Sequence, residues 1–298
     1  FFKWAIMIGF LAHTFGLGIR WYISGHAPWS NGYESMIYIA WATILSGVIY
    51  AKKSTLTLAA TAVVSALLLM VAHLNWLDPE ITNLVPVLKS YWLMIHVAII
   101  TASYGFLVLG AILGLIALLL ITFTNSTNKV KLKNTLSELT IINEKSLEVG
   151  LFMLTIGTFL GGVWANESWG RYWGWDPKET WALASVLVYV FVLHMRFIPF
   201  WRNSFYLNFM SMIAIKSIIM TYFGVNYYLS GLHSYAAGDP MPIPFFVPFI
   251  VVLFLILGFI AFFRFKEQYE KNIKFGSFLI LVILFHPEVW IYLISQIF

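Results

Sequence analysis

The sequence predicts an all-α, polytopic integral membrane protein with about nine transmembrane segments, organised as a single domain over 1–298. Hydrophobic residues make up 60% of the chain and charged residues 10%, and the mean hydropathy is +0.83, which excludes an ordinary soluble domain. The apolar residues form long continuous runs instead of strict alternation, which favours membrane-spanning helices over a β-barrel.

The predicted spans follow one another with short polar connections. A spanning helix needs ~20 apolar residues, and most of the segments satisfy this; the second is short, and the fourth is long enough to tilt or to project beyond the bilayer. The polar stretch 124–147 is interpreted as a cytoplasmic loop, either a surface helix or a flexible connection, with no chemistry of its own. The nine segments lie at about 2–22, 35–51, 55–74, 91–123, 148–166, 179–199, 205–227, 243–263 and 275–298.

The basic residues predict the orientation of these spans. One set of alternating connections holds thirteen of them and the other set four, and the positive-inside rule places the first set in the cytoplasm. The stretch 164–181 then lies in a loop outside the membrane, which means the periplasm for a bacterial inner membrane. The first set comprises Lys3, Lys52, Lys53, Lys129, Lys131, Lys133, Lys145, Arg196, Arg202, Arg264, Lys266, Lys271 and Lys274, and the second Arg20, Lys89, Arg171 and Lys178.

Two further features of the sequence limit its chemistry. It contains no cysteine, which excludes a disulfide, a thiolate metal site and a thiol nucleophile within this chain. It begins at Phe1, without methionine and inside an apolar run, so we expect the natural chain to begin earlier or to carry a preceding fused domain.

The loop 164–181 is the most unusual stretch, because it holds five tryptophans, Trp164, Trp169, Trp173, Trp175 and Trp181. Such a cluster with interspersed glycines can form a wall for a large flat ligand. The alternative is an aromatic belt at the membrane interface, where tryptophan is enriched in any case. Composition alone leaves both interpretations open.

The string WGRYWGWDPKETWA at 169–182 resembles the tryptophan-rich WWD signature of membrane proteins that handle haem during cytochrome c maturation. Its form is most similar to that of the CcsA (ResC) family of the system II cytochrome c synthase, or of the CcsA part of a fused CcsBA. Three other segments also match this family: SGHAPWSNGYES at 24–35, SYWLMIHVAIITASYG at 90–105 and YFGVNYYLSGLHSYA at 222–236. The resemblance therefore covers most of the chain.

This resemblance implies a cytochrome c haem lyase, with haem b as substrate. Such an enzyme joins the vinyl groups of haem to the thiols of a CxxCH segment in apocytochrome c, and conveys haem across the membrane. The implied partners are a CcsB-type subunit, separate or fused, and apocytochrome c, with thiol-reducing proteins as further candidates. An alternative is a haem transporter or chaperone without ligation activity. A quinone-linked subunit with structural haem is a third, weaker reading, because such proteins pair their histidines within the span region.

The family motif also implies site residues in this sequence. His96 and His233 correspond to the ligands of an outer haem iron, and His194 to a ligand of an inner haem iron whose opposing ligand comes from the CcsB-type partner. The predicted contacts with the outer porphyrin are Trp169, Gly170, Trp173, Gly174, Trp175 and Asp176, with the three tryptophans positioning the haem for catalysis.

Local patterns give a structural reading of several of these residues. Asp176, Pro177 and Glu179 predict a helix start, with Asp176 as the N-cap. Arg171 and Lys178 are candidates for contact with haem propionates or with an acidic partner, and solvated charges are the alternative.

The remaining polar residues in apolar surroundings have weaker assignments. Lys216 is predicted to face a polar interior, where it meets either a haem propionate or a carboxylate of a partner. The loop with His26 is interpreted as architectural, with contact to substrate as the alternative, and the role of His13 stays open. An interfacial position is expected for His73, and a kink for His286.

Overall fold

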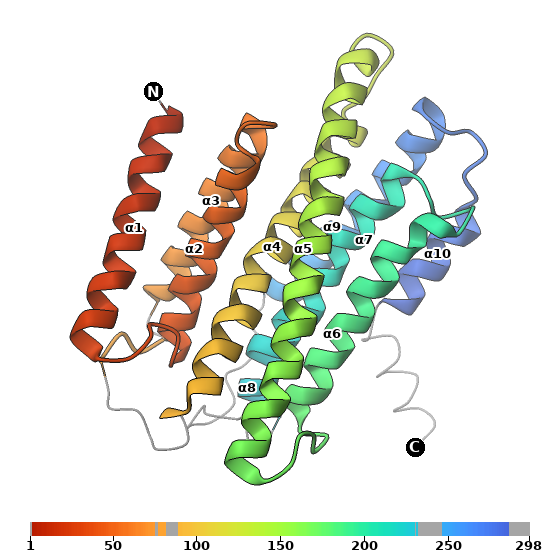
Figure 1. Cartoon of the computed structure of the whole chain (residues 1–298). Coiled ribbons are helices and arrows are strands. Elements are labelled where there is room, and N and C mark those ends of the chain that lie inside the picture. The colour runs from red at the N-terminus through yellow and green to blue at the C-terminus, as the bar shows by residue number, and fades with distance from the viewer. Residues whose placement is uncertain (1, 75–76, 82–88, 230, 232–245, 286–298) are drawn as a thin grey trace.

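The computed structural model describes residues 2–74, 77–81, 89–229, 231 and 246–285, and over these ranges it is a helical bundle without strands (Figure 1). This confirms the predicted all-α class. In chain order the elements are α1 (Phe2–Ser24), α2 (Gly32–Tyr50), α3 (Thr55–Ala72), α4 (Tyr91–Thr122), α5 (Lys129–Trp169), α6 (Pro177–His194), η2 (Met195–Phe197), α7 (Ser204–Ile219), η3 (Met220–Gly224), α8 (Val225–Tyr228), α9 (Phe246–Gln268) and α10 (Phe275–Leu284).

Each of the nine predicted apolar segments contains a helix, which confirms a polytopic membrane protein. Among the described residues, seven helical stretches are long and apolar enough to cross a membrane. The remaining two predicted segments correspond to α2, which packs against α3 and α4, and to α10, of which ten residues are described. The seven stretches are Phe2–Ser24, Thr55–Ala72, Tyr91–Thr122, Lys129–Trp169, Pro177–Phe197, Ser204–Tyr228 and Phe246–Gln268.

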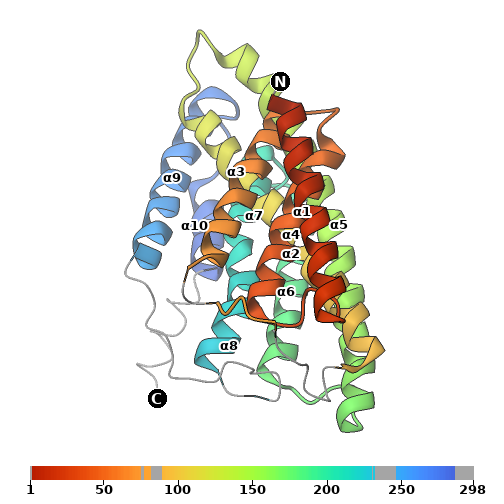
Figure 2. The same cartoon turned by 90° about the vertical axis from the view of Figure 1, so that its left-hand side faces the viewer.

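The helix α4 lies at the centre of the bundle and contacts α2, α3, α5, α7 and α9. Small residues let these neighbours approach closely, as is usual between helices in membranes. A Cβ added at Gly105 would lie 2.6 Å from the backbone carbonyl carbon of Ala42 on α2. By contrast, α1 lies at the left edge of the bundle in Figure 1 and in front of the other helices in Figure 2, with 6% of its apolar stretch buried.

The segment 124–147, expected to form a cytoplasmic loop as either a surface helix or a flexible connection, is mostly helix. The connection after α4 is short, and from Lys129 the chain forms one continuous helix of 41 residues to Trp169. At 1.5 Å per residue, α5 is ~60 Å long, about twice the thickness of the hydrocarbon core of a bilayer. Its polar first half is ordered because apolar side chains such as Leu136, Leu139 and Ile142 are buried against neighbouring helices.

The loop predicted over 164–181 is shorter than expected, because α5 runs to Trp169 and α6 begins at Pro177. We call the end of the bundle that holds this loop the tryptophan end, and the end at which α4 stops and α5 starts the lysine end. The directions of the helices place the connections of the four-residue basic set at the tryptophan end and those of the thirteen-residue set at the lysine end (Figure 1).

Candidate functional site

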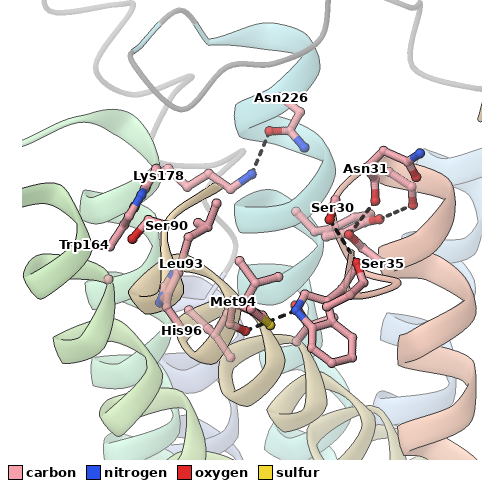
Figure 3. A pocket seen from close by; sticks show the side chains of 18 of the residues that line it. Ser30, Asn31, Ser35, Ser90, Leu93, Met94, His96, Trp164, Lys178 and Asn226 are labelled. Carbon is pink, nitrogen blue, oxygen red and sulfur yellow. Dashed lines mark hydrogen bonds between the residues drawn. The ribbon is translucent and has the colours of Figure 1, made fainter. Parts of the chain in front are cut away.

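A cavity of about 900 Å³ opens at the tryptophan end of the bundle (Figure 3). Its size lies in the upper part of the range of ~300–1,000 Å³ found for cofactor and small-molecule sites. Its walls come from six places: the connection between α1 and α2, the connection between α3 and α4, the start of α4, the end of α5, the loop before α6 with the start of α6, and the region of η3 and α8. The lining residues include His26, Trp29, Ser30, Asn31, Ser90, Met94, His96, Tyr104, Gly161, Trp164, Tyr172, Trp173, Lys178, Glu179, Tyr222 and Asn226.

His96 contributes an imidazole to this cavity from the second turn of α4. Its Nδ1 atom lies 2.6 Å from the carbonyl oxygen of Gly157 on α5. The ring lies against Gly161, where an added Cβ would be 2.7 Å from the Cε1 atom of His96. It also stacks at 6.4 Å on Trp164, which is 1% exposed. Backbone and side-chain contacts with α5 thus fix the orientation of the ring.

The predicted tryptophan contacts take three different positions. Trp173 lines the cavity. Trp169 packs edge-to-face on Trp164 at 4.9 Å, and Trp175 meets Trp173 edge-to-face at 5.7 Å with 71% of its surface exposed. Neither Trp169 nor Trp175 is among the residues lining the cavity. Trp164, which lines it directly beside His96, was noted as part of the cluster but not predicted as a contact.

The loop between α5 and α6 has a defined backbone conformation. Gly170 ends α5 in the left-handed region with φ 70°, and its N–H donates to Asn166. At the other end, Asp176 caps α6, Pro177 occupies the first turn and Glu179 completes a capping box. The predicted helix start is confirmed.

Glu179 also stabilises the backbone on both sides of Trp175, which lies in the loop between Gly170 and Asp176. Its Oε2 atom accepts hydrogen bonds from the N–H groups of Gly174 at 2.7 Å and Asp176 at 3.2 Å. Trp175, between them, has φ 57°, a left-handed conformation that costs a residue other than glycine energy. The guanidinium of Arg171 lies where a side chain at position 174 would be, so a larger residue there would displace this flexible side chain.

Lys178 and Asn226 form the polar contact on another wall. The Nζ atom of Lys178 donates to Oδ1 of Asn226 at 2.7 Å, as Figure 3 shows. Asn226 follows η3, a π-helical turn, and such turns interrupt α-helices often at functional sites. Within the same turn, the Tyr222 hydroxyl donates to the carbonyl oxygen of Gly32 at 2.8 Å. The sequence suggested Lys178 as a candidate; Asn226 and Tyr222 lie in the segment 222–236 that resembles the family, but neither was singled out there.

The connection between α1 and α2 is held by a network of hydrogen bonds, and it also lines the cavity. Glu34 is fully buried and accepts hydrogen bonds from Arg20 at 2.8 Å and from the backbone of Ser30 at 2.8 Å. Arg20 in turn donates to the carbonyl oxygen of Pro79 at 3.0 Å. His26 is half-buried and its Nδ1 atom lies 3.2 Å from both Ser30 Oγ and the Ala27 carbonyl oxygen.

The second predicted iron ligand, His233, lies outside the described residues, as does His286. Gly231, two residues before His233, is described, and it approaches the start of α6 closely. A Cβ added there would lie 2.9 Å from the Cδ atom of Pro177 and would overlap with the Asp176 carboxylate. The chain therefore passes the loop next to the cavity immediately before it reaches His233.

The structure does not bring His194 to this cavity. It is the last residue of α6, at the lysine end, ~26 Å from the start of that helix at 1.5 Å per residue. Its side chain is exposed, and Nδ1 lies 2.7 Å from the carbonyl oxygen of Val190. The other polar residues considered above lie elsewhere: His13 is half-buried on α1, His73 is exposed at the end of α3, and Lys216 is half-buried on α7.

Known proteins resemble this chain over most of its length. The family model described as "Cytochrome C assembly protein" matches residues 29–233, which includes α2 to α8 and most of the cavity wall. The CcsA protein of Guillardia theta is 36% identical over 246 residues, 74% of this chain and 81% of that protein, and that of Prochlorococcus marinus (strain MIT 9301) is 34% identical over 248 residues, 74% and 80% respectively. Protein NrfI of Wolinella succinogenes is 52% identical over 233 residues, which is 78% of this chain but 26% of NrfI. The chain thus spans about a quarter of the length of NrfI.

Proposed function

The chain belongs to the cytochrome c assembly protein family, and from this premise we propose that it is the haem-binding subunit of a cytochrome c haem lyase. Its substrates are haem b and an apocytochrome c with a CxxCH segment. Its product is the cytochrome c in which two thioether bonds join the haem to that segment. The observation that carries the proposal is the cavity of about 900 Å³, into which His96 and Trp173 both project from rigid helical or capped elements.

His96 and His233 are the proposed axial ligands of the haem iron. A carbonyl oxygen only accepts hydrogen bonds, so the contact with Gly157 assigns the proton of a neutral His96 imidazole to Nδ1. A hydrogen bond from Nδ1 to a carbonyl oxygen orients a coordinating imidazole and raises its basicity as a ligand through Nε2. The position of Gly231 against Asp176 and Pro177 supports His233 as the second ligand, because two residues of chain span at most ~7 Å.

The proposed reaction needs positioning more than acid–base groups. Each thiol of the client adds across one vinyl group, so that sulfur bonds to one carbon and the hydrogen to the other. This addition consumes a double bond, forms a C–S and a C–H bond, and requires no external oxidant. Because the chain has no cysteine, both sulfur atoms come from the client. The aromatic walls hold the macrocycle near the incoming peptide and exclude water, while haem itself supplies the reactivity.

The protein also conveys haem across the membrane in this proposal, together with a CcsB-type partner subunit. The thirteen basic residues at the lysine end support a cytoplasmic location for that end, and hence a periplasmic or external location for the cavity, in a bacterial inner membrane. His194 is exposed at the lysine end, and we propose that it shares an inner haem with a CcsB-type subunit. The haem would then pass from that site to the cavity.

Absorption spectra of the purified full chain test the outer site. We expect sharp bands of reduced haem in the wild type, their loss in His96→Ala and in His233→Ala, and their recovery when imidazole is added. His73→Ala is the matched control, because His73 is exposed and does not line the cavity. Haem bands unchanged in both cavity variants would refute the outer bis-histidine site.

A ligation assay then separates the lyase from a transporter or chaperone. The haem-loaded protein is mixed with reduced apocytochrome c, with and without a CcsB-type partner, and covalent haem is measured on denaturing gels. Covalent product that depends on His96 supports the lyase. Haem transfer to the client without thioether bonds would refute the lyase and support the transporter.

A further inference from the structure

Two lysines line the cavity, and they differ in their surroundings. Lys89 is exposed, just ahead of α4. Lys178 is half-buried in the first turn of α6, and its Nζ atom contacts the amide oxygen of Asn226 at 2.7 Å. The ammonium group of Lys178 is therefore held by the neutral amide of Asn226 inside a partly enclosed space.

The two carboxylates closest to Lys178 in the chain are engaged with backbone groups. The Oδ2 atom of Asp176 accepts from the backbone N–H of Lys178 at 3.1 Å, and the Oε2 atom of Glu179 accepts from Gly174 and Asp176. Among the ion pairs formed by described residues, which include Arg20 with Glu34 and Arg196 with Glu144, none involves Lys178.

An ammonium group carries three N–H donors, and one amide oxygen satisfies only one of them. Withdrawing a cation from water is costly unless opposite charge or further hydrogen bonds compensate it. The Asp176 carboxylate already attracts this ammonium group, and a ligand with an anionic oxygen at this point of the cavity would supply further opposite charge together with a second acceptor. Asn226 could bind the same group, because its amide also carries N–H donors.

We propose that Lys178 and Asn226 form a carboxylate subsite of the cavity, which binds a propionate group of haem; this inference rests on the proposed function. Figure 3 shows Lys178 reaching over the cavity from α6 toward Asn226, with His96 on a different wall. The propionates and the vinyl groups lie on different edges of the macrocycle. Anchoring a propionate between α6 and α8 therefore fixes which way the vinyl edge points while His96 holds the iron.

This assignment separates two cations that the sequence treated alike. The guanidinium of Arg171 lies over Gly174, and Arg171 is not among the residues lining the cavity. Lys178 lines it and is held in place from both α6 and α8. Asn226 owes its position to the π-helical turn before it, so the turn has a role in forming the subsite.

The test compares haem with its dimethyl ester, in which both propionates are neutral. Each is titrated into the purified full chain in lipid nanodiscs, and binding is followed by absorption. A hydrogen bond to a charged group contributes ~1.5–3 kcal/mol, so we expect the wild type to bind haem about 10- to 100-fold more tightly than the ester. Lys178→Met should lower the affinity for haem by that factor and leave the ester unchanged, and Lys178→Arg should restore the preference for haem.

Lys52→Met is the matched variant, since it removes an exposed lysine that does not line the cavity. We expect it to change the haem affinity less than two-fold. An equal effect of the two methionine variants, or equal binding of haem and ester by the wild type, would overturn the subsite; the latter comparison requires no variant to fold. If the wild type binds no haem through His96, the proposed function fails and the subsite falls with it.

Discussion

His96 and Gly157 join α4 and α5 at the cavity through a contact of 2.6 Å between Nδ1 and the carbonyl oxygen. The contact depends on a close approach of the two helices, because a Cβ at position 157 would lie 2.8 Å from the Cβ of Ile100. It sets both the tautomer and the direction of the imidazole. The geometry of the proposed iron ligand is therefore built by α5 as much as by α4.

Gly161→Ala tests this dependence without removing the histidine. The new methyl group would lie 2.7 Å from Cε1 of His96, so the ring must tilt and its contact with Gly157 must weaken. Loss of the hydrogen bond that orients a coordinating histidine typically costs about 10- to 100-fold in affinity for a metal centre, and we expect haem affinity to fall by about that factor. Haem titration measures it. Gly276→Ala, where nothing lies within 4 Å, is the control and should bind haem as the wild type does.

Glu179→Ala should loosen the loop that carries Trp173 and Trp175. The substitution removes the acceptor for the N–H groups of Gly174 and Asp176, which flank the left-handed Trp175. Losing a capping interaction costs about 0.5–2 kcal/mol, so we expect the free energy of unfolding to fall by about that amount. Hydrogen exchange at residues 174 and 176 should accelerate, as measured by mass spectrometry.

The control for this variant is Glu267→Ala, since Glu267 is exposed and pairs with Arg264 on the surface. It should leave exchange in the loop unchanged. Equal protection of the loop in wild type and Glu179→Ala would contradict the assigned role of the carboxylate.

Arg20→Met should destabilise the tryptophan end by about 3–5 kcal/mol, because it leaves the fully buried Glu34 without its ion pair. Glu34→Gln should cost a comparable amount. The double variant should cost less than the sum of the two, which thermal unfolding in a double-mutant cycle measures. The exposed pair of Lys145 and Glu148 is the reference, with an expected coupling below about 1 kcal/mol. Additive effects at Arg20 and Glu34 would show that the pair does not act as a unit.

Gly105→Ala tests the packing of α2 on α4. The added Cβ would lie 2.6 Å from the carbonyl carbon and 2.7 Å from the Cβ of Ala42, and backbone atoms cannot yield without moving α2. Overpacking of this kind costs about 1–3 kcal/mol, so the thermal midpoint should fall. At Gly16 on α1 nothing lies within 4 Å, and Gly16→Ala should instead raise stability by up to about 1 kcal/mol through helix propensity. If both variants changed the thermal midpoint in the same direction, the predicted packing of α2 on α4 would be contradicted.

Local and compositional features could be predicted well. The apolar segments, the separation of the basic residues and the helix start at Asp176 each depend on a few residues or on one window of the chain. The extension of α5 to Lys129 could not be predicted in the same way. Its polar half is stabilised by side chains such as Leu139 and Leu147, which are buried against α4 across the helix pair, a tertiary contact that no local pattern reveals.

The sequence alone determined that this is a helical membrane protein with a tryptophan-rich loop at one end, because hydrophobicity and capping act over short stretches of chain. Only the tertiary structure decided which side chains share the cavity: Trp164 and Trp173 line it, while Trp169 and Trp175 do not. The same holds for Lys178 and Asn226, which are 48 residues apart and meet because α6 packs on α8 beyond a π-helical turn. Such contacts depend on the rotation of each helix about its axis and on the distance between helices. Both depend on the sizes of the side chains on all neighbouring helices at once, so no single stretch of sequence determines them.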